Sequence, residues 1–259
     1  MTPLTNDSDK DWERFGQTDP YYAVLSEERF RRDQLTSDGL TEFFRSGREH
    51  VERVLAIIRE RLDPAFRPMH ALDFGCGVGR VLVPLAECCE AVTGLDISEA
   101  MLAEARRNCE CAGMANVQLG LADDDVSAAV GAYDLVHCYI VLQHVPVPRG
   151  ERIIRALVKR LAPRGVAVLH VTYMHEVPRS RRLLYWARTR VPFGNALLNV
   201  SLGRSPSAPM MQGNDYSITR LLDSVHELGC GEVHVRFTNH QGNRGVLLFC
   251  RKEATPVFT

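Results

Sequence analysis

The chain has 259 residues, of which 45% are hydrophobic and 24% are charged, proportions that are usual for a globular protein. Its 31 basic and 32 acidic residues leave a net charge of −1, which argues against a protein that grips nucleic-acid phosphates along a basic surface. No apolar run approaches the ~20 residues that span a bilayer, and the polar segment 1–10 is unlike a secretory or transit peptide. We therefore expect a cytoplasmic protein without a membrane span.

The chain contains 8 cysteines, and none of them forms a C-x-x-C pair, the spacing typical of zinc and redox sites. Cys109 and Cys111 come closest, but residues two apart in a helix point to different faces. Most of the other cysteines lie in apolar stretches, where the thiol is a small buried hydrophobic group. We expect neither a metal site nor disulfides.

Residues 1–65 are polar and predict helices joined by loops, which we interpret as an N-terminal helical lid. Within this region, residues 39–62 are amphipathic, and Pro64 follows them as a stop signal. The apolar side chains at helical spacing are Val51, Val54, Leu55, Ile58 and Leu62.

From residue 69 the pattern changes to an alternation of strands and helices. Strands are predicted at 69–74, 91–96, 117–121, 133–140 and 165–172. Helices are predicted at 79–88, 98–111, 149–161 and, briefly, near 125–130. Such alternation favours a mostly parallel sheet that is covered by helices on both faces.

An insertion at about 173–213, rich in arginine and in turn-forming residues, interrupts this alternation. A helix that Ser217 caps and Gly229 ends comes next, followed by strands at 233–237 and 246–250. A short turn joins the last two strands, so they must be antiparallel. The expected fold class is α/β: a doubly wound, mostly parallel, seven-stranded sheet with one antiparallel C-terminal strand.

The strongest motif is the segment Ala71-Leu72-Asp73-Phe74-Gly75-Cys76-Gly77-Val78-Gly79-Arg80, in which a buried strand runs into alternating glycines and a helix. Glycines there permit a tight turn and let a ligand approach bare backbone. The helix N-terminus adds unpaired N–H groups and the positive end of a dipole. The G-x-G-x-G spacing differs from the G-x-G-x-x-G of dinucleotide-binding enzymes.

Acidic residues follow the next two strands. Asp96 ends the second strand about 20 residues beyond Gly75, where a carboxylate can accept hydrogen bonds from both hydroxyls of a ribose. The alternative is that Asp96 caps the following helix, a role that Ser98 can fill alone. The third strand is followed by Ala122, Asp123, Asp124 and Asp125. A carboxylate at this point can accept from an adenine amine, or simply start a helix.

Together these motifs resemble those of class I S-adenosylmethionine-dependent methyltransferases. Segment 72–79 is similar to the first motif of that family, and Gly94-Leu95-Asp96-Ile97-Ser98 to its ribose motif. The adenine motif is similar to Ala122-Asp123. The fourth-strand region of the family resembles Tyr133-Asp134-Leu135-Val136 followed by Leu142-Gln143-His144-Val145. The turn before strand five resembles Leu161-Ala162-Pro163-Arg164-Gly165. The resemblance covers about residues 40–251. It implies a Rossmann-like domain at 66–259 that binds S-adenosylmethionine and releases S-adenosylhomocysteine.

The same resemblance implies a role for each matching residue. Backbone groups of Gly75, Cys76 and Gly77 would hold the methionyl end, while Asp73 would fix the loop or the amine and Arg80 would help to place the tail. The other implied contacts are Gly79 and Ser98 beside the loop, Asp96 at the ribose, Ile97 and Ala122 at the adenine ring, Asp123 or Asp124 at its amine, and Tyr139 and Gln143 at the transferred methyl.

Methyl transfer from a sulfonium is a direct displacement, so alignment supplies much of the acceleration, and a base is needed only if the acceptor must lose a proton early. His144, just after strand four, is the best candidate base, with Tyr139 beside it; the alternative is a packing role for His144. Other residues at this edge that can face an acceptor are His175, Tyr216, Asn239 and His240. The aromatic residues of the lid, Trp12 among them, would pack over the cofactor or anchor a helix.

We therefore expect a methyltransferase that acts on an oxygen or nitrogen of a small-molecule acceptor. Nucleic acid is a poor candidate, because Ile140-Val141-Leu142-Gln143 replaces the Asn/Asp-Pro-Pro-Tyr/Phe motif of amino-methylating nucleic-acid enzymes. Two alternatives remain: a methyltransferase-like binding protein without catalysis, and a nicotinamide-dependent oxidoreductase, whose loop needs the longer glycine spacing. The sequence leaves the acceptor and the oligomeric state open.

Overall fold

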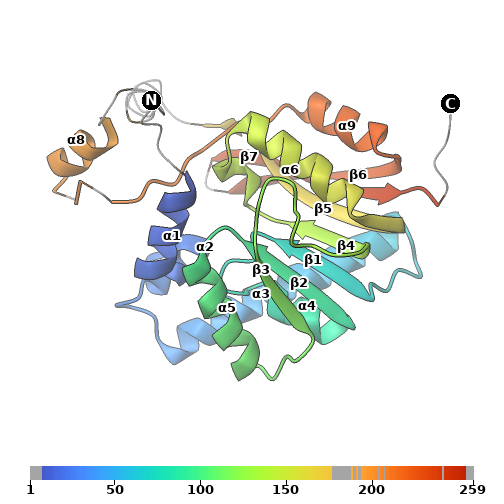
Figure 1. Cartoon of the computed structure of the whole chain (residues 1–259), viewed down its shortest axis with the longest axis horizontal. Helices are drawn as coiled ribbons and strands as arrows, with labels where there is room; N and C mark the ends of the chain where they lie inside the picture. The colour runs from blue at the N-terminus through green and yellow to red at the C-terminus, as the bar shows by residue number, and fades with distance from the viewer. Residues whose placement is uncertain are drawn as a thin grey trace.

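The structure is a computed structural model that describes residues 8–176, 188, 191, 194–203, 205–206, 208–240 and 242–254. Figure 1 shows one twisted sheet with helices on both faces: α6 and α9 on one side, and α3, α4 and α5 on the other. The N-terminal helices α1 and α2 lie beside α5, at one end of the sheet.

The sheet has seven strands in the order β3-β2-β1-β4-β5-β7-β6. Their bounds are β1 His70–Phe74, β2 Ala91–Asp96, β3 Val117–Leu121, β4 Tyr133–Cys138, β5 Leu161–His175, β6 Cys230–His240 and β7 Asn243–Lys252. Neighbours from β3 to β5 are parallel, whereas β7 is antiparallel to both β5 and β6. The prediction of a mostly parallel sheet with one reversed strand is confirmed. The carboxyl ends of β1 to β6 consequently meet at one edge.

The helices bury the faces that the sequence pattern indicated. Their bounds are α3 Ser37–Arg61, α4 Leu82–Cys88, α5 Glu99–Cys111, α6 Val147–Lys159 and α9 Ile218–Glu227. On α6 the side chains of Ile153, Ile154, Leu157 and Val158 are at most 2% exposed. Burying each contributes about 1.5–3 kcal/mol. Ser98 and Ser217 cap α5 and α9 as expected, by accepting from the backbone N–H groups of Met101 and Arg220.

The N-terminal segment packs on the start of α5. It contains α1 (Ser8–Thr18), α2 (Pro20–Val24) and a 3-10 helix, η1 (Glu28–Phe30). A Cβ at Gly16 would come within 2.6 Å of the Ser98 hydroxyl, so glycine allows α1 to approach this closely. Glu13 accepts hydrogen bonds from that hydroxyl (2.8 Å) and from the Ala100 N–H (3.2 Å).

The structure departs from two of the predicted helices most clearly, whereas α6 is shifted by two residues at each end, to Val147–Lys159. Residues 125–130 form turns instead of a helix, because the Asp123 carboxylate accepts the N–H groups of Asp125 and Ser127 and Val126 has a φ of 53°. Helix α4 begins at Leu82 instead of residue 79, since Gly79 has a φ of 90°, outside the helical region.

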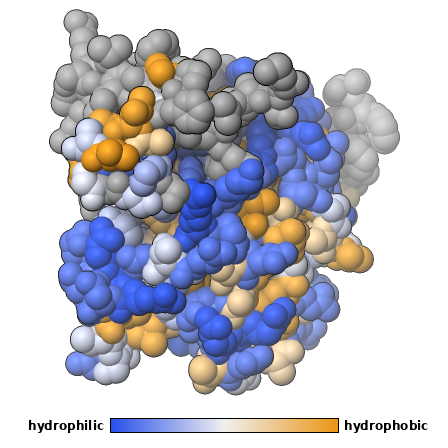
Figure 2. All heavy atoms as spheres, turned by 60° about the vertical axis from the view of Figure 1, so that its left-hand side comes forward, coloured by the Kyte–Doolittle hydropathy of each residue, from blue (hydrophilic) through white to orange (hydrophobic). Residues whose placement is uncertain are grey.

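Most arginines of the predicted insertion, Arg179, Arg181, Arg182 and Arg190, lie outside the described residues. Arg188 is described and donates to Asn195 (2.9 Å) and Asn199 (3.2 Å) of helix α8 (Gly194–Ser201). The face brought forward in Figure 2 is mostly hydrophilic, with smaller apolar groups between the polar ones. Within the described ranges, no helix is both long and apolar enough to cross a membrane.

Candidate cofactor and substrate cavity

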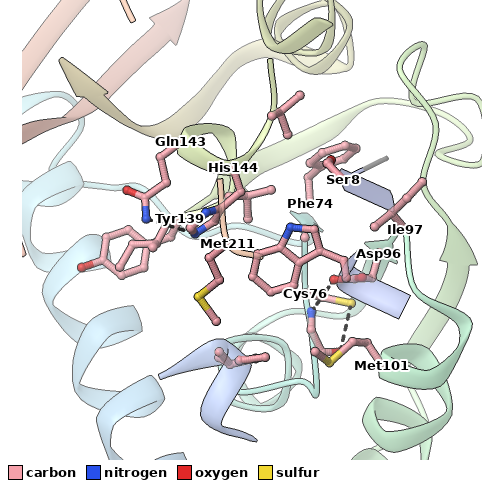
Figure 3. A pocket seen from close by; sticks show the side chains of 18 of the residues that line it. Ser8, Phe74, Cys76, Asp96, Ile97, Met101, Tyr139, Gln143, His144 and Met211 are labelled. Carbon is pink, nitrogen blue, oxygen red and sulfur yellow. Dashed lines mark hydrogen bonds between the residues drawn. The ribbon is translucent and has the colours of Figure 1, made fainter. Parts of the chain in front are cut away.

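A cavity of about 690 Å³ lies at the carboxyl edge of the sheet. It is lined by the glycine loop, by the ends of β2 and β4, by the β6–β7 turn and by side chains of α1. Figure 3 shows Asp96 and Ile97 at one end, Tyr139 at the other, and Gln143, His144 and Met211 between them along one wall. Ligands of open parallel sheets bind in this position.

The glycine loop needs glycine for two separate reasons. Gly75, Gly77 and Gly79 have φ values of 74°, 53° and 90°, a region that other residues rarely adopt. In addition, a Cβ on Gly77 would lie 2.8 Å from the Val24 side chain. The loop is held against β2 by hydrogen bonds from the N–H groups of Gly75 (2.7 Å) and Cys76 (3.0 Å) to the Leu95 carbonyl.

Asp96 lies between this loop and α5, with its carboxylate lining the cavity (Figure 3). Its two oxygens accept the N–H groups of Gly77 (2.8 Å) and Ser98 (3.0 Å). Burial raises the pKa of Asp96 to about 6, although these hydrogen bonds act in the opposite direction. The helix cap itself is Ser98, whose hydroxyl accepts from Met101, so Asp96 is not needed for that role.

The residues expected at an adenine ring surround the same end of the cavity. Ile97 and the buried Ala122 line it, together with Asp123 and Asp124. Asp123 is engaged in the turn described above, and Asp124 forms an ion pair with Arg149. The adenine role of these carboxylates stays a prediction.

Two buried groups of opposite charge lie at the other side of the loop. Arg80 is 7% exposed, and its Nε has no hydrogen-bond partner among the described residues. A long contact of 3.4 Å joins its guanidinium to the Ser46 hydroxyl. Burial lowers the pKa of Arg80, against the attraction of Asp73. Both residues line the cavity, and among the described residues no ion pair is found for Arg80.

Asp73 belongs to a buried chain that the sequence interpretation missed. His137 Nδ1 lies 2.8 Å from Asp73 Oδ1, and His50 Nε2 lies 2.9 Å from His137 Nε2. All three residues are at most 9% exposed. Two features pointed to this chain of contacts. Asp73 and His137 are direct neighbours in the β1–β4 register, and His50 lies on the same face of α3 as Val54.

His144, the candidate base, has a hydrogen-bond partner at each ring nitrogen. His144 Nδ1 lies 2.7 Å from the Gln212 carbonyl and its Nε2 lies 3.1 Å from the Gln143 amide nitrogen. Because Thr172 donates to the Gln143 amide oxygen (2.7 Å), the amide nitrogen is the atom that faces His144. Burial lowers the pKa of His144 to about 4. His144 is thus a neutral imidazole with both nitrogens engaged.

Tyr139 lines the end of the cavity next to the β6–β7 turn. His175, Asn239, His240 and Asn243 line the cavity there as well, with His175 paired to Asp215. Tyr216 does not line it: its hydroxyl donates to the Val145 carbonyl at 2.9 Å.

Helix α1 covers the cavity from outside. Trp12 lines it and packs against the His144 ring, with centroids 5.0 Å apart. Arg149 bridges Asp9 of α1 to Asp124, which ties the helix to the adenine end. No group of His, Cys, Asp or Glu able to hold a metal ion is found in the part of the chain that the structure describes.

A family model described as a methyltransferase domain matches residues 71–165. The chain is 35% identical over 107 residues to a magnesium-protoporphyrin O-methyltransferase of Synechocystis, an alignment that covers 38% of this chain and 46% of the relative. It is 37% identical over 95 residues to a ubiquinone biosynthesis O-methyltransferase of Hydrogenovibrio crunogenus, covering 36% and 39%. The matched region is thus less than half the length of either relative.

Two solved structures share the fold. The magnesium protoporphyrin IX methyltransferase from Synechocystis, with S-adenosylhomocysteine bound, has a TM-score of 0.62 at 19% identity, covering 95% of this chain and 100% of that one. An N-methyltransferase from Bradyrhizobium japonicum, also with S-adenosylhomocysteine bound, gives 0.57 at 15% identity, covering 95% and 99%. Residues 71–165 therefore match a methyltransferase-domain model, and the chain has the fold of these two solved methyltransferases.

Proposed function

We propose that this cavity binds S-adenosylmethionine and that the chain transfers its methyl group to an oxygen or nitrogen of a small molecule. Arg80 carries the proposal. A buried charge without a partner is costly, so such a group persists where a ligand completes it. With Asp73 beside it, Arg80 offers one positive and one negative group to the amino-acid end of the cofactor: carboxylate to Arg80, ammonium to Asp73.

The rest of the cavity fits the remainder of this molecule. Gly75, Cys76 and Gly77 would present their backbone groups to the methionyl chain, and Asp96 would accept hydrogen bonds from the ribose hydroxyls. The adenine would lie between Ile97 and Ala122, with Asp123 or Asp124 near its amine. Gly79 and Ser98 keep the loop and the start of α5 in place.

S-adenosylmethionine supplies a methyl group on a positively charged sulfur. The chain's own residues orient the reactants and exclude water, and orientation supplies much of the rate acceleration of a displacement reaction. Helix α1 closes one side through Trp12 and through the Asp9–Arg149 ion pair. Tyr139 and Gln143 line the wall where the acceptor would meet the methyl group.

A small-molecule acceptor suits a cavity that α1 covers, and the named curated relatives are O-methyltransferases. The same geometry serves a protein that binds the cofactor without catalysis, so binding and turnover need separate tests. A nicotinamide dinucleotide is the remaining alternative, and it is distinguished by direct binding.

The experiment compares two ligands on Arg80→Met. S-adenosylhomocysteine has the amino-acid end, whereas 5′-methylthioadenosine keeps the adenosine and the thioether but lacks that end. We expect the variant to lose about 10–100-fold in affinity for S-adenosylhomocysteine and none for 5′-methylthioadenosine, measured by calorimetry. Arg48→Met is the matched control, because Arg48 is an exposed arginine paired with Glu87. Equal losses for both ligands, or no loss for either, would contradict the assignment.

A further inference from the structure

The acceptor end of the cavity is built mostly from amide and imidazole side chains. It comprises the end of β5, the β6–β7 turn and the segment before α9: His175, Met211, Gln212, Asn239, His240 and Asn243. The carboxylates that line the cavity, such as Asp73, Asp96 and Asp124, belong to the cofactor half or to the lid. Among the described residues, the carboxylates next to this end are already paired: Asp215 with His175, and Glu27, which follows the Ser26 that contacts Met211, with Arg29. A cationic amine would have to compete with these pairs.

Most groups on the cavity wall that can take up a proton are already engaged. His137 is held by Asp73, His175 by Asp215, and both nitrogens of His144 are engaged. His240 differs from them. Its Nε2 makes a long contact of 3.4 Å with the Tyr139 hydroxyl.

Tyr139 is fixed by the rings around it. The His50 ring lies 4.0 Å from the Tyr139 ring, at an angle of 33°, and the His170 ring meets its edge at 5.3 Å. His170 in turn contacts Thr238 (2.9 Å), which lies two residues before His240 on β6. Burial raises the pKa of Tyr139, while Arg80 and Arg53 act against it, and burial lowers the pKa of His240. A phenol donor therefore faces a neutral imidazole acceptor.

We propose that Tyr139 and His240 form the subsite for the acceptor, and that this acceptor is a hydroxyl compound. The acceptor O–H donates to the Tyr139 oxygen, and the Tyr139 O–H donates to His240 Nε2. This inference rests on the proposed function, and it assigns the proton-accepting role to His240 in place of His144.

The reaction balances as follows. The acceptor oxygen forms the new bond to the methyl carbon, the carbon–sulfur bond breaks, and its electron pair stays on sulfur. The acceptor proton passes to the Tyr139 oxygen while the Tyr139 proton passes to His240. The products are the methyl ether, S-adenosylhomocysteine and a protonated His240, which returns its proton to solvent. No oxidant or metal is required for this balance.

The test uses 4-nitrophenol, a hydroxyl probe whose ionised form absorbs visible light. Protein loaded with S-adenosylhomocysteine is titrated with the probe at a pH just below the probe's own pKa. Wild type should bind the un-ionised phenol, which lowers the visible absorbance. Tyr139→Phe and His240→Ala each remove one hydrogen bond of the subsite and should weaken probe binding about tenfold. His234→Ala, on the same strand but outside the cavity lining, should match wild type.

Calorimetry with S-adenosylhomocysteine on the same samples separates the two claims. If that ligand fails to bind wild type, the proposed function itself fails. If it binds but the probe does not, or if Tyr139→Phe and His240→Ala respond like wild type, the acceptor subsite alone is overturned. Binding of 4-nitroaniline more tightly than 4-nitrophenol would equally overturn the hydroxyl assignment.

Discussion

Arg80→Met should make the ligand-free protein more stable, although Arg80 is buried. The substitution removes a guanidinium whose Nε has no partner among the described residues, while methionine keeps an aliphatic stem of similar length against α3. An unsatisfied buried polar group costs about 1–3 kcal/mol. In a chain of this size, each kcal/mol corresponds to about 2–4 °C in melting temperature.

The ligand should shrink this advantage of the variant. S-adenosylhomocysteine at about 100 times its Kd stabilises wild type by about 2.7 kcal/mol, and a variant with tenfold weaker affinity gains only about 1.4 kcal/mol at that concentration. Thermal unfolding followed by circular dichroism, with and without the ligand, measures both effects, and Arg48→Met serves as the surface control. The reasoning is refuted if Arg80→Met melts below wild type without ligand and shows the full ligand-induced shift.

Three further predictions concern the loop, the ribose acid and the candidate base. Because the pKa of Asp96 is raised to about 6, its carboxylate becomes protonated as the pH falls from about 7 to 5. The affinity for S-adenosylhomocysteine should drop over this range by up to ~10-fold per pH unit. Calorimetry on Asp96→Asn should show no such pH dependence. Gly77→Ala should abolish binding while the far-ultraviolet spectrum is preserved, because its φ of 53° and the 2.8 Å approach to Val24 exclude a Cβ; normal calorimetric binding would mean that the loop is only a turn. His144→Ala should lower the melting temperature and reduce turnover without abolishing it, since both ring nitrogens have structural partners; a loss beyond ~10⁴-fold at unchanged stability would identify it as the base instead.

Hydrophobic periodicity was sufficient to predict the sheet, because most of its strands contain a short apolar run, and Val233, Val235 and Phe237 of β6 alternate with polar residues. The loop and Asp96 followed from their positions after the first two strands, and the structure brings both to one cavity. The predicted helix at 125–130 was wrong because the Asp123 side chain competes for the backbone N–H groups that a helix would use.

The burial of Arg80 and the contact between Tyr139 and His240 could not be predicted from the sequence, for a different reason. Among the described residues the Nε of Arg80 has no hydrogen-bond partner, because the side chain is buried, and no local sequence pattern reports that burial. The contact between Tyr139 and His240 joins the residue after β4 to the last residue of β6, and β5 and β7 separate these two strands in the sheet. Such pairs depend on register and twist, whereas Asp73 and His137, on adjacent strands, were within reach of a register argument.

Calorimetric titration of the purified wild-type chain with S-adenosylhomocysteine, and separately with NAD, tests the central claim most directly. Our account predicts one binding event per chain for S-adenosylhomocysteine, lost in Gly77→Ala and weakened in Asp96→Asn at neutral pH, and no heat above dilution for NAD. Saturable binding of NAD, with none for S-adenosylhomocysteine, would contradict the account.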